Sequence, residues 1–212
     1  MTDAAGRQRA QARQGGARLG GVRQGPPPAA LAAVRQIAEL SARIIARATE
    51  RGATIAVAES LTGGLVAATL VRTPGASAVL RLGIVAYETA MKHEVLRVPA
   101  PLLAERGPVD PDVAIAMARG ARQLAAMDRS ACTIAVATTG VAGPDAQDGH
   151  APGEFHIGLE VLAAAGPVAS STSHRATGDR EAVRAAALLA ALQALDAALG
   201  RDDLAIHSQS TS

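Results

Sequence analysis

The sequence predicts an α/β domain in which helices cover a layered sheet, and three observations lead to this prediction. Segments with apolar residues at helical spacing alternate with short, continuously apolar segments typical of buried strands. Toward the end of the chain two strand-like segments follow each other directly, which indicates an antiparallel hairpin in the sheet. Hydrophobic residues make up 49% of the 212 residues, although only Tyr87 and Phe155 are aromatic. The core is therefore expected to consist of Ala, Val, Leu and Ile.

The first part of the chain alternates between helix and strand. Residues 29–50 repeat apolar positions at helical spacing, so a helix is predicted there. Residues 53–58 form a short apolar strand, and residues 62–72 return to a helical pattern that Pro74-Gly75 ends. Residues 79–87 are then predicted to be a second strand.

Two helices are predicted in the middle of the chain. Residues 88–97 suit a short helix. A longer helix is predicted to begin after Asp110 and to end near Met127, because an aspartate can cap a helix and Pro111 suits the first helical position.

The last part of the chain contains the hairpin and a long helix. Residues 132–140 are the clearest buried strand, and a loop rich in glycine and proline follows them. Two strands at 154–164 and 166–177 are joined by a turn near Gly166. The final helix is predicted to start after Asp179, which acts as its N-cap.

The two ends of the chain differ in composition from the domain between them, which we place at residues 28–200. Residues 1–27 hold five arginines against Asp3, lack periodicity and are predicted to be disordered, and residues 201–212 are predicted to be a loose tail. Without the first segment the chain has a net charge of −2, so nucleic acid is an expected partner only through the Arg-rich tail. Cys132 is the only cysteine, and no apolar run reaches about 18 residues. We therefore expect a cytoplasmic protein that does not contact the membrane.

Polar side chains gather where three of the predicted strands end: residues 59–64, residues 87–92 and residues 138–144. Ligands of open α/β sheets bind where strands end and helices begin. In the segment "AESLTGG", Ser60 lies beside glycines whose backbone N–H groups can approach a ligand closely. The alternative is that Ser60 or Thr62 only caps the following helix.

Lys92 is the only lysine among 21 basic residues, the other 20 being arginine. An arginine cannot lose its proton in a protein, whereas a partly desolvated lysine can, so Lys92 is a candidate base. Ser60, Tyr87 and Lys92 together form the residue set of a Ser–Lys nucleophilic site, in which Lys92 would accept the hydroxyl proton and Tyr87 would relay it or polarise the substrate. The same three residue types occur in short-chain reductases, but the chain has no G-x-G-x-x-G fingerprint. His150 and His156 lack a cysteine pair, so no metal or other cofactor is expected.

Four motifs resemble the CinA C-terminal domain family over residues 30 to 200: "AESLTGG", "GIVAYETAMK", "TGVAGPD" and "GDREAVR". The family includes amidases that hydrolyse nicotinamide mononucleotide to nicotinate mononucleotide and ammonia. The resemblance implies a three-layer α/β/α domain with a mixed, mainly parallel sheet. It also implies a catalytic set of Ser60, Tyr87 and Lys92.

A hydrolase of this kind gives roles to further residues at the strand ends. We expect the backbone N–H groups from Thr62 to Gly64, including Gly63, to stabilise an oxyanion, and Glu59 to orient Lys92 or a hydroxyl. Thr139, Gly140 and Arg180 are candidates for ribose and phosphate contacts. For each of these three, a helix cap or a surface charge is an equal alternative.

The sequence departs from the family pattern at two positions. Asp110 stands where serine is usual, and Glu154 stands at a threonine-like position. These two carboxylates affect the choice of substrate more than the hydrolytic reaction. An amidase for another carboxamide is therefore one alternative. A catalytically idle nucleotide-binding or interaction module is another. The expected partner is a small nucleotide. The sequence does not decide whether the protein forms a homo-oligomer.

Overall fold

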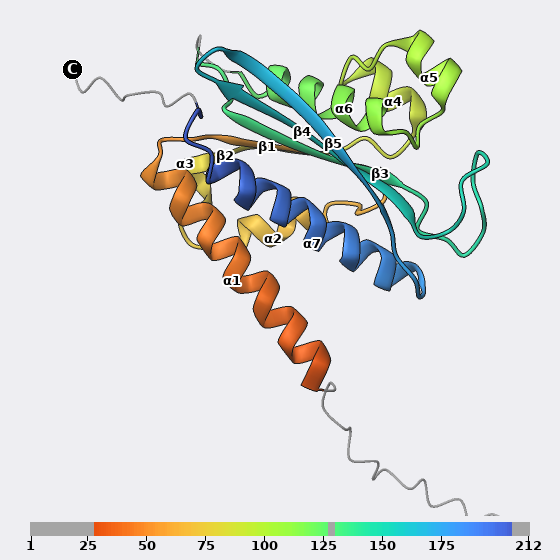
Figure 1. The fold of residues 1–212 in the computed structure, drawn as a ribbon, viewed down its shortest axis with the longest axis horizontal. Coiled ribbons are helices and arrows are strands. Elements are labelled where there is room, and N and C mark those ends of the chain that lie inside the picture. Colours follow the sequence, from red (N-terminus) through yellow and green to blue (C-terminus); the bar gives the residue numbers. More distant parts are fainter. Residues whose placement is uncertain (1–27, 127–129, 205–212) are drawn as a thin grey trace, which may run out of the picture.

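One mixed sheet forms the centre of the protein in a computed structural model that describes residues 28–126 and 130–204 (Figure 1). Within these residues the strand order is β2-β1-β3-β4-β5. β1 pairs in parallel with β2 and β3, whereas β4 pairs antiparallel with β3 and β5. The strands are β1 Ile55–Glu59, β2 Leu80–Val85, β3 Ile134–Gly140, β4 Glu154–Ala163 and β5 Gly166–Arg175.

The predicted α/β class and the mixed sheet are confirmed, with one correction to the balance of strand directions. The sheet was expected to be mainly parallel, but two of its four pairings are parallel and two are antiparallel. The predicted hairpin is the reason, because its two strands are the longest of the sheet and both run antiparallel to their neighbours. The hairpin turn lies at residues 164–165, immediately before Gly166.

Helices cover both faces of the sheet and complete three layers. Figure 1 shows α1, α2 and α7 on one face and α4, α5 and α6 on the other. The helices are α1 Pro28–Glu50, α2 Leu65–Val71, α3 Ala76–Val79, α4 Thr89–Glu94, α5 Ala100–Arg106, α6 Pro111–Leu124 and α7 Arg180–Leu199.

Most of the predicted elements occur close to their predicted bounds, and the differences concern short helices. α3 and α5 were not predicted: α3 starts directly after Pro74-Gly75, and α5 has a proline in its first turn. The helix that was predicted to reach Met127 ends at Leu124. Asp110 and Asp179 cap α6 and α7 as predicted: the Asp110 side chain accepts two backbone N–H groups of its helix, and the Asp179 side chain accepts one.

Alternating residues of the central strands belong to two separate cores. Ile55 and Val57 of β1 pack toward α1 and α7, whereas Ala56 and Ala58 pack toward α6. The small residues on the α6 side allow close packing of this helix. At Gly158 of β4, for example, an added Cβ would lie 2.0 Å from the carbonyl oxygen of Ala114. The strand exits that carry the polar motifs are therefore held between two rigid layers.

α7 is the core helix on the other face. Val183, Ala187, Leu188, Ala191 and Leu195 repeat at helical spacing and are buried. Among the described helices, α7 is also long and apolar enough to cross a membrane by length and composition. Here its apolar side lies on the sheet and on α1.

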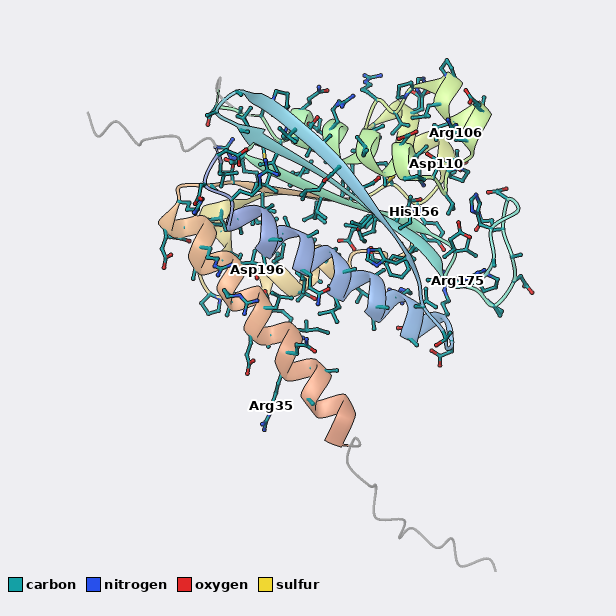
Figure 2. The ribbon with its side chains drawn as sticks, viewed as in Figure 1. Arg35, Arg106, Asp110, His156, Arg175 and Asp196 are labelled. Atoms are coloured by element: carbon teal, nitrogen blue, oxygen red, sulfur yellow. The ribbon has the colours of Figure 1, made fainter. Side chains whose placement is uncertain are left out.

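Charged residues add a second link between α1 and α7. Asp196 of α7 accepts hydrogen bonds from Arg43 and Arg47 of α1, both at 2.8 Å (Figure 2). The hydrogen bond from Arg43 is the main reason that the pKa of Asp196 lies below its usual value. Because both arginines are largely exposed, this cluster adds only modestly to stability.

The predicted tails fall mostly outside the described residues, which exclude 1–27 and 205–212. The beginning of the predicted C-terminal tail is an exception. Leu204 is buried in the α7-side core and forms a bridge with Ala163 at the end of β4. The backbone N–H of Ala164 donates to the carbonyl oxygen of Asp203 at 2.9 Å. Residues 201–204 therefore belong to the folded domain, contrary to the prediction.

Candidate active site

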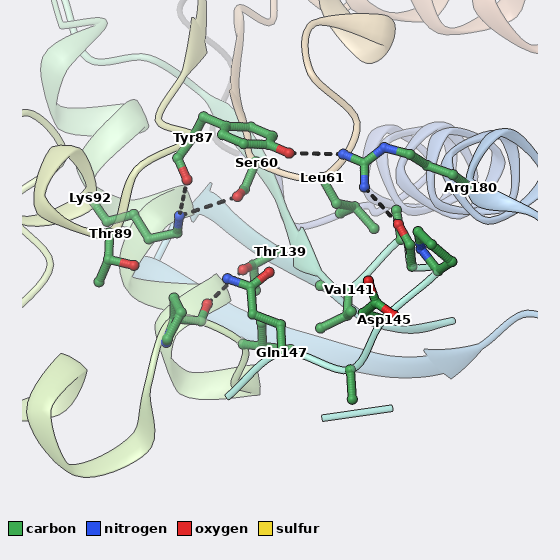
Figure 3. A pocket seen from close by; sticks show the side chains of 17 residues that line it. Ser60, Leu61, Tyr87, Thr89, Lys92, Thr139, Val141, Asp145, Gln147 and Arg180 are labelled. Atoms are coloured by element: carbon green, nitrogen blue, oxygen red, sulfur yellow. Dashed lines mark hydrogen bonds between the residues drawn. The ribbon is translucent and has the colours of Figure 1, made fainter. Parts of the chain in front are cut away.

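A cavity of about 290 Å³ lies at the carboxyl ends of β1 and β3, where the sequence placed its polar motifs (Figure 3). Such a position follows from the parallel arrangement of these strands, whose ends open at the same edge of the sheet. Its lining comprises Ser60, Leu61, Tyr87, Thr89, Lys92, Pro108, Val109, residues 139–147 and Arg180.

Ser60 lies in the tight turn between β1 and α2. Its backbone N–H donates to the carbonyl oxygen of Thr138 at 3.0 Å, which fixes the start of the turn against β3. Gly63 and Gly64 follow with φ angles of 60° and 97°, a region that glycine adopts without steric cost. The turn leaves the Ser60 side chain at the cavity although the residue is only 8% exposed.

Lys92 enters the same cavity from α4 and is 1% exposed. Its Nζ lies 3.2 Å from Ser60 Oγ, 2.9 Å from the carbonyl oxygen of Ala86 and 3.4 Å from that of Tyr87. In the described part of the chain no carboxylate forms an ion pair with this amine. Burial therefore lowers the pKa of Lys92 to about 8.

The three contacts of Lys92 can form in both protonation states of the amine. The ammonium form has three N–H donors, one for each of Ser60 Oγ and the carbonyl oxygens of Ala86 and Tyr87. The neutral form has two N–H bonds for the carbonyl oxygens, and its lone pair can then accept the hydroxyl proton of Ser60. The predicted pairing of a serine with the only lysine thus has the geometry of a nucleophile and its base.

Tyr87 does not take the position expected of a proton relay. Its side chain is 60% exposed, and its hydroxyl oxygen accepts a hydrogen bond from Arg180 Nη2 at 2.8 Å. Only its backbone carbonyl contacts Lys92. The tyrosine lies two residues after the end of β2, and its ring turns outward along the cavity edge toward α7 (Figure 3). The expected relay through the Tyr87 hydroxyl is therefore not formed in this structure.

Glu59 likewise contacts neither Lys92 nor the cavity. It is fully buried, and its carboxylate accepts backbone N–H groups from Gly64 at 2.9 Å, Val66 at 3.1 Å and Ala67 at 2.9 Å. The expected orientation of the lysine by Glu59 is thus wrong for this structure. A carboxylate at a strand end can reach the N-terminus of the next helix, and here that is its partner.

The expected oxyanion donors are also partly reassigned. The N–H of Gly63 donates to the Ser60 carbonyl oxygen at 3.0 Å, and that of Gly64 donates to Glu59. Among the described residues of this turn, the N–H groups of Leu61 and Thr62 have no protein acceptor. The Thr62 side chain is buried and shares a hydrogen bond of 2.7 Å with Thr138 Oγ1, so this hydroxyl is not part of the cavity.

Thr139, Gly140 and Arg180 line the cavity, as their predicted role requires. Thr139 Oγ1 donates to the carbonyl oxygen of Pro108 at 2.6 Å, which fixes the loop before α6. Arg180 donates to the carbonyl oxygen of Gly143 at 2.9 Å and to the Tyr87 hydroxyl. The guanidinium thus joins two sides of the cavity.

The loop after β3 forms one wall of the cavity. Residues 138–144 were predicted to belong to the site, and the structure extends this wall to Gln147. The loop ends in a tight turn, in which Gln147 and His150 exchange backbone hydrogen bonds around Asp148 and Gly149. Their φ angles of 51° and 82° suit an Asp-Gly hairpin turn.

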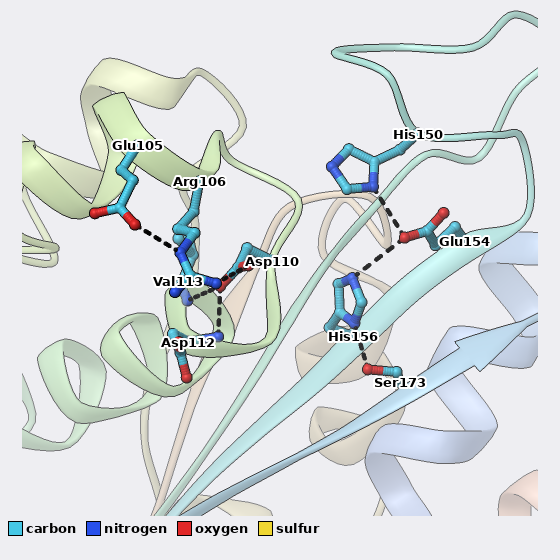
Figure 4. Close-up of polar contacts among 9 residues, drawn as sticks. All are labelled: Glu105, Arg106, Asp110, Asp112, Val113, His150, Glu154, His156 and Ser173. Atoms are coloured by element: carbon cyan, nitrogen blue, oxygen red, sulfur yellow. Dashed lines mark hydrogen bonds and ion pairs between the residues drawn. The ribbon is translucent and has the colours of Figure 1, made fainter.

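The two unusual carboxylates lie on either side of His156 (Figure 4). Glu154 Oε1 is 2.9 Å from His150 Nδ1 and 3.8 Å from His156 Nε2. Burial lowers the pKa of His156, although the charges of Glu154 and Asp110 act in the opposite direction. His156 and Thr139 are cross-strand partners, so this cluster lies beside the cavity. Neither carboxylate lines the cavity itself.

No group of three or more metal-binding side chains is arranged to hold an ion in the part of the chain that the structure describes.

The chain is similar in sequence to proteins of one family. The model of the CinA C-terminal domain family matches residues 37–199. A CinA-like protein of Anaeromyxobacter sp. (strain Fw109-5) is 46% identical over 162 residues, which are 76% of this chain and 37% of that protein. A putative competence-damage inducible protein of Geobacillus kaustophilus is 41% identical over 147 residues, 68% of this chain and 33% of that one. The chain thus spans about a third of the length of the curated relatives it matches.

Solved structures show the same fold. The competence/damage inducible protein CihA from Agrobacterium tumefaciens has a TM-score of 0.69 and 34% identity, over 78% of this chain and 96% of that one. The competence damage-inducible protein A from Klebsiella pneumoniae has a TM-score of 0.71 and 30% identity, over 78% of this chain and 98% of that one.

Proposed function

The chain belongs to the CinA C-terminal domain family, and from this premise we propose that it is a Ser–Lys amidohydrolase that deamidates nicotinamide mononucleotide to nicotinate mononucleotide and ammonia. The observation that carries the proposal is the contact between the only lysine and a serine. Lys92 Nζ lies 3.2 Å from Ser60 Oγ, both residues are buried, and the pKa of the amine is lowered to about 8. A structural lysine has no need of these properties.

The reaction starts with attack of Ser60 Oγ on the carboxamide carbon. The hydroxyl proton passes to the neutral amine of Lys92, and a tetrahedral intermediate forms. The protonated amine then gives the proton to the leaving nitrogen, so that ammonia departs and an ester of Ser60 remains. Lys92, neutral again, takes a proton from a water molecule that attacks this ester. The C–Oγ bond then breaks, Lys92 returns the proton to Ser60 Oγ, and the acid product leaves.

The oxyanion of the intermediate needs hydrogen-bond donors close to Ser60. We assign this role to the backbone N–H groups of Leu61 and Thr62, which have no protein acceptor among the described residues of the turn. A donor of this kind is worth about 3–4 kcal/mol to the transition state in comparable sites.

The rest of the nucleotide is assigned to the opposite side of the cavity. Arg180 is the cation of the lining besides Lys92, and its guanidinium joins Tyr87 and Gly143 at the cavity edge. A phosphate group can replace these neutral acceptors and gain charge-assisted hydrogen bonds.

One feature favours a second candidate, an amidase for a carboxamide without a phosphate group. Asp145 lines the cavity, and Asp110 caps α6 next to the lining residue Val109. Carboxylates near the cavity repel a phosphate. A panel of carboxamides with and without a phosphate group separates the two candidates by their kcat/KM values.

Ammonia release from nicotinamide mononucleotide by the purified protein tests the proposal. Ser60→Ala and Lys92→Arg are expected to lower kcat on the order of 1,000-fold or more. The first variant removes the nucleophile and the second removes the base, and neither group works without the other. Lys92→Arg is the more informative variant, since it keeps the positive charge of the side chain and removes its ability to act as a base. Ser41→Ala is the matched control, because Ser41 is also a buried serine, and its hydroxyl bonds to Thr69 and Thr73, away from the cavity. Full activity in both site variants would exclude the assignment.

The interaction-module alternative makes a different prediction in the same assay. It predicts nucleotide binding without ammonia release, and unchanged binding in Lys92→Arg.

A further inference from the structure

The carboxylate of Glu59 takes part in no step of the proposed reaction, although it belongs to the residue before the nucleophile. It is 0% exposed. Its two oxygens accept three backbone N–H groups, from Gly64 and Val66 on Oε2 and from Ala67 on Oε1. Each of these N–H groups belongs to the beginning of α2. The side chain therefore ties the end of β1 to the start of α2.

A buried carboxylate is a costly way to cap a helix. In the part of the chain that the structure describes, Glu59 forms no ion pair, so the N–H groups of α2 and the helix dipole alone offset its charge. α6 and α7 are capped by Asp110 and Asp179, which are less buried and reach N–H groups two or three residues ahead. Glu59 reaches N–H groups five, seven and eight residues ahead. It thus closes a loop around the turn that carries Ser60, which a local cap would not do.

The loop closed by Glu59 decides which N–H groups of the turn are free. Ser60 and Gly63 donate within the backbone, and Gly64 donates to Glu59. The N–H groups of Leu61, which lines the cavity, and of Thr62, which does not, have no protein acceptor among the described residues of the turn. If the carboxylate were absent, the Gly64 N–H and the start of α2 would lose their acceptor, and the turn would have no fixed end.

We propose that Glu59 is a positioning residue, which holds Ser60 and the N–H groups of Leu61 and Thr62 in the geometry that stabilises the oxyanion. This inference rests on the proposed hydrolase function. It assigns the carboxylate to the geometry of the acylation step and not to the basicity of Lys92, whose contacts are the carbonyl oxygens of Ala86 and Tyr87 and the hydroxyl of Ser60.

The rate of modification by a fluorophosphonate tests the inference. The reagent forms a bond between Ser60 Oγ and phosphorus, fluoride leaves with the P–F bonding electrons, and Lys92 accepts the hydroxyl proton. Glu59→Gln keeps the size of the side chain, but its amide group turns a donor toward N–H donors. We expect a second-order rate constant at least tenfold lower than that of the wild type, with an unchanged pH midpoint. For the amide substrate we expect kcat to fall at least tenfold and KM to stay within twofold.

Glu160→Gln is the matched control. Glu160 is also a buried glutamate, 2% exposed, but it pairs with Arg119 and Arg122 of α6, away from the cavity. This variant is expected to lose stability and to keep the wild-type rate of modification. If it slows as much as Glu59→Gln, the effect is a general loss of stability and the inference is wrong.

The outcomes separate this inference from the proposed function. If the wild type neither releases ammonia nor reacts with the reagent, the proposed function fails. If the wild type reacts and Glu59→Gln reacts within twofold of it, or with a shifted pH midpoint, only the inference fails.

Amide NMR of the wild type replaces the variant if Glu59→Gln does not fold. On modification of Ser60, the amide proton signals of Leu61 and Thr62 are expected to move downfield, because they gain an acceptor. The signals of Gly64, Val66 and Ala67 are expected to stay in place. The opposite pattern would overturn the inference.

Discussion

Replacing Lys92 by methionine tests whether burial in the folded protein lowers the pKa of this amine. Methionine has a similar length and no charge, so it removes the titration and keeps most of the volume. Because Lys92 is the only lysine of the chain, no other lysine obscures the comparison. The prediction concerns the difference between the two proteins in the free energy of unfolding, measured as a function of pH.

The magnitude follows from the lowered pKa. In the unfolded chain the amine keeps its ordinary pKa of 10.5, whereas burial lowers it to about 8 in the folded protein. Between these values the unfolded state binds more protons than the folded state, so the stability of the wild type rises with pH. At about 1.36 kcal/mol for each pH unit the whole effect is about 3 kcal/mol. Below pH 8 this amount counts against the wild type, and above pH 10.5 it is absent.

Urea unfolding of both proteins at several pH values from 7 to 11 measures the effect. The wild type is expected to gain about 3 kcal/mol relative to Lys92→Met over this range, and all other groups titrate equally in the two proteins. Parallel stability curves would refute the reasoning, because they would mean that the amine keeps its ordinary pKa when folded. In the same pH range, kcat/KM of the wild type is expected to rise and to reach a plateau above pH 8, since only the neutral amine is a base.

Three further variants address the other residues of the site and the packing behind it. Tyr87→Phe is expected to lower kcat/KM less than about tenfold, because the Tyr87 hydroxyl forms one exposed hydrogen bond, to Arg180. A loss above a hundredfold in steady-state kinetics would show that this hydroxyl is a proton relay. Arg180→Leu is expected to raise KM about tenfold with little change in kcat, since it removes a binding contact that is equal in ground and transition states, and a fall in kcat alone would contradict this role. Gly140→Ala is expected to lower the free energy of unfolding by about 1–3 kcal/mol, because its Cβ would lie 2.4 Å from Phe155 Cβ, and an unchanged thermal unfolding midpoint would disprove the packing argument.

Much of the fold could be predicted because its signals are local. The helical period of residues 29–50, the apolar strand at 132–140 and the caps Asp110 and Asp179 each depend on neighbouring residues, and each is found in the structure. The short helices α3 and α5 were missed because Pro74-Gly75 and the prolines at 99 and 101 interrupt the helical pattern there. The equal balance of parallel and antiparallel pairings depends on how distant strands meet, which the sequence pattern does not contain.

The same distinction applies to the candidate site. Ser60 and Lys92 were identified from residue type and position, and the structure brings them within 3.2 Å. The partners of Tyr87 and Glu59 were not predicted correctly. Tyr87 bonds to an arginine 93 positions later in the chain, and Glu59 bonds to backbone groups that exist as free donors only once α2 has formed.

The sequence by itself determined the class of the domain, the family and the two side chains of the proposed nucleophile and base. These are carried by periodicity, by motifs and by a single lysine among arginines, all of which are properties of the linear chain. Only the tertiary structure decided the state of that lysine and the partners of its neighbours. The physical reason is that the pKa of an amine and the acceptor of a hydrogen bond depend on desolvation and on distances between segments that come together only when the sheet is covered on both faces.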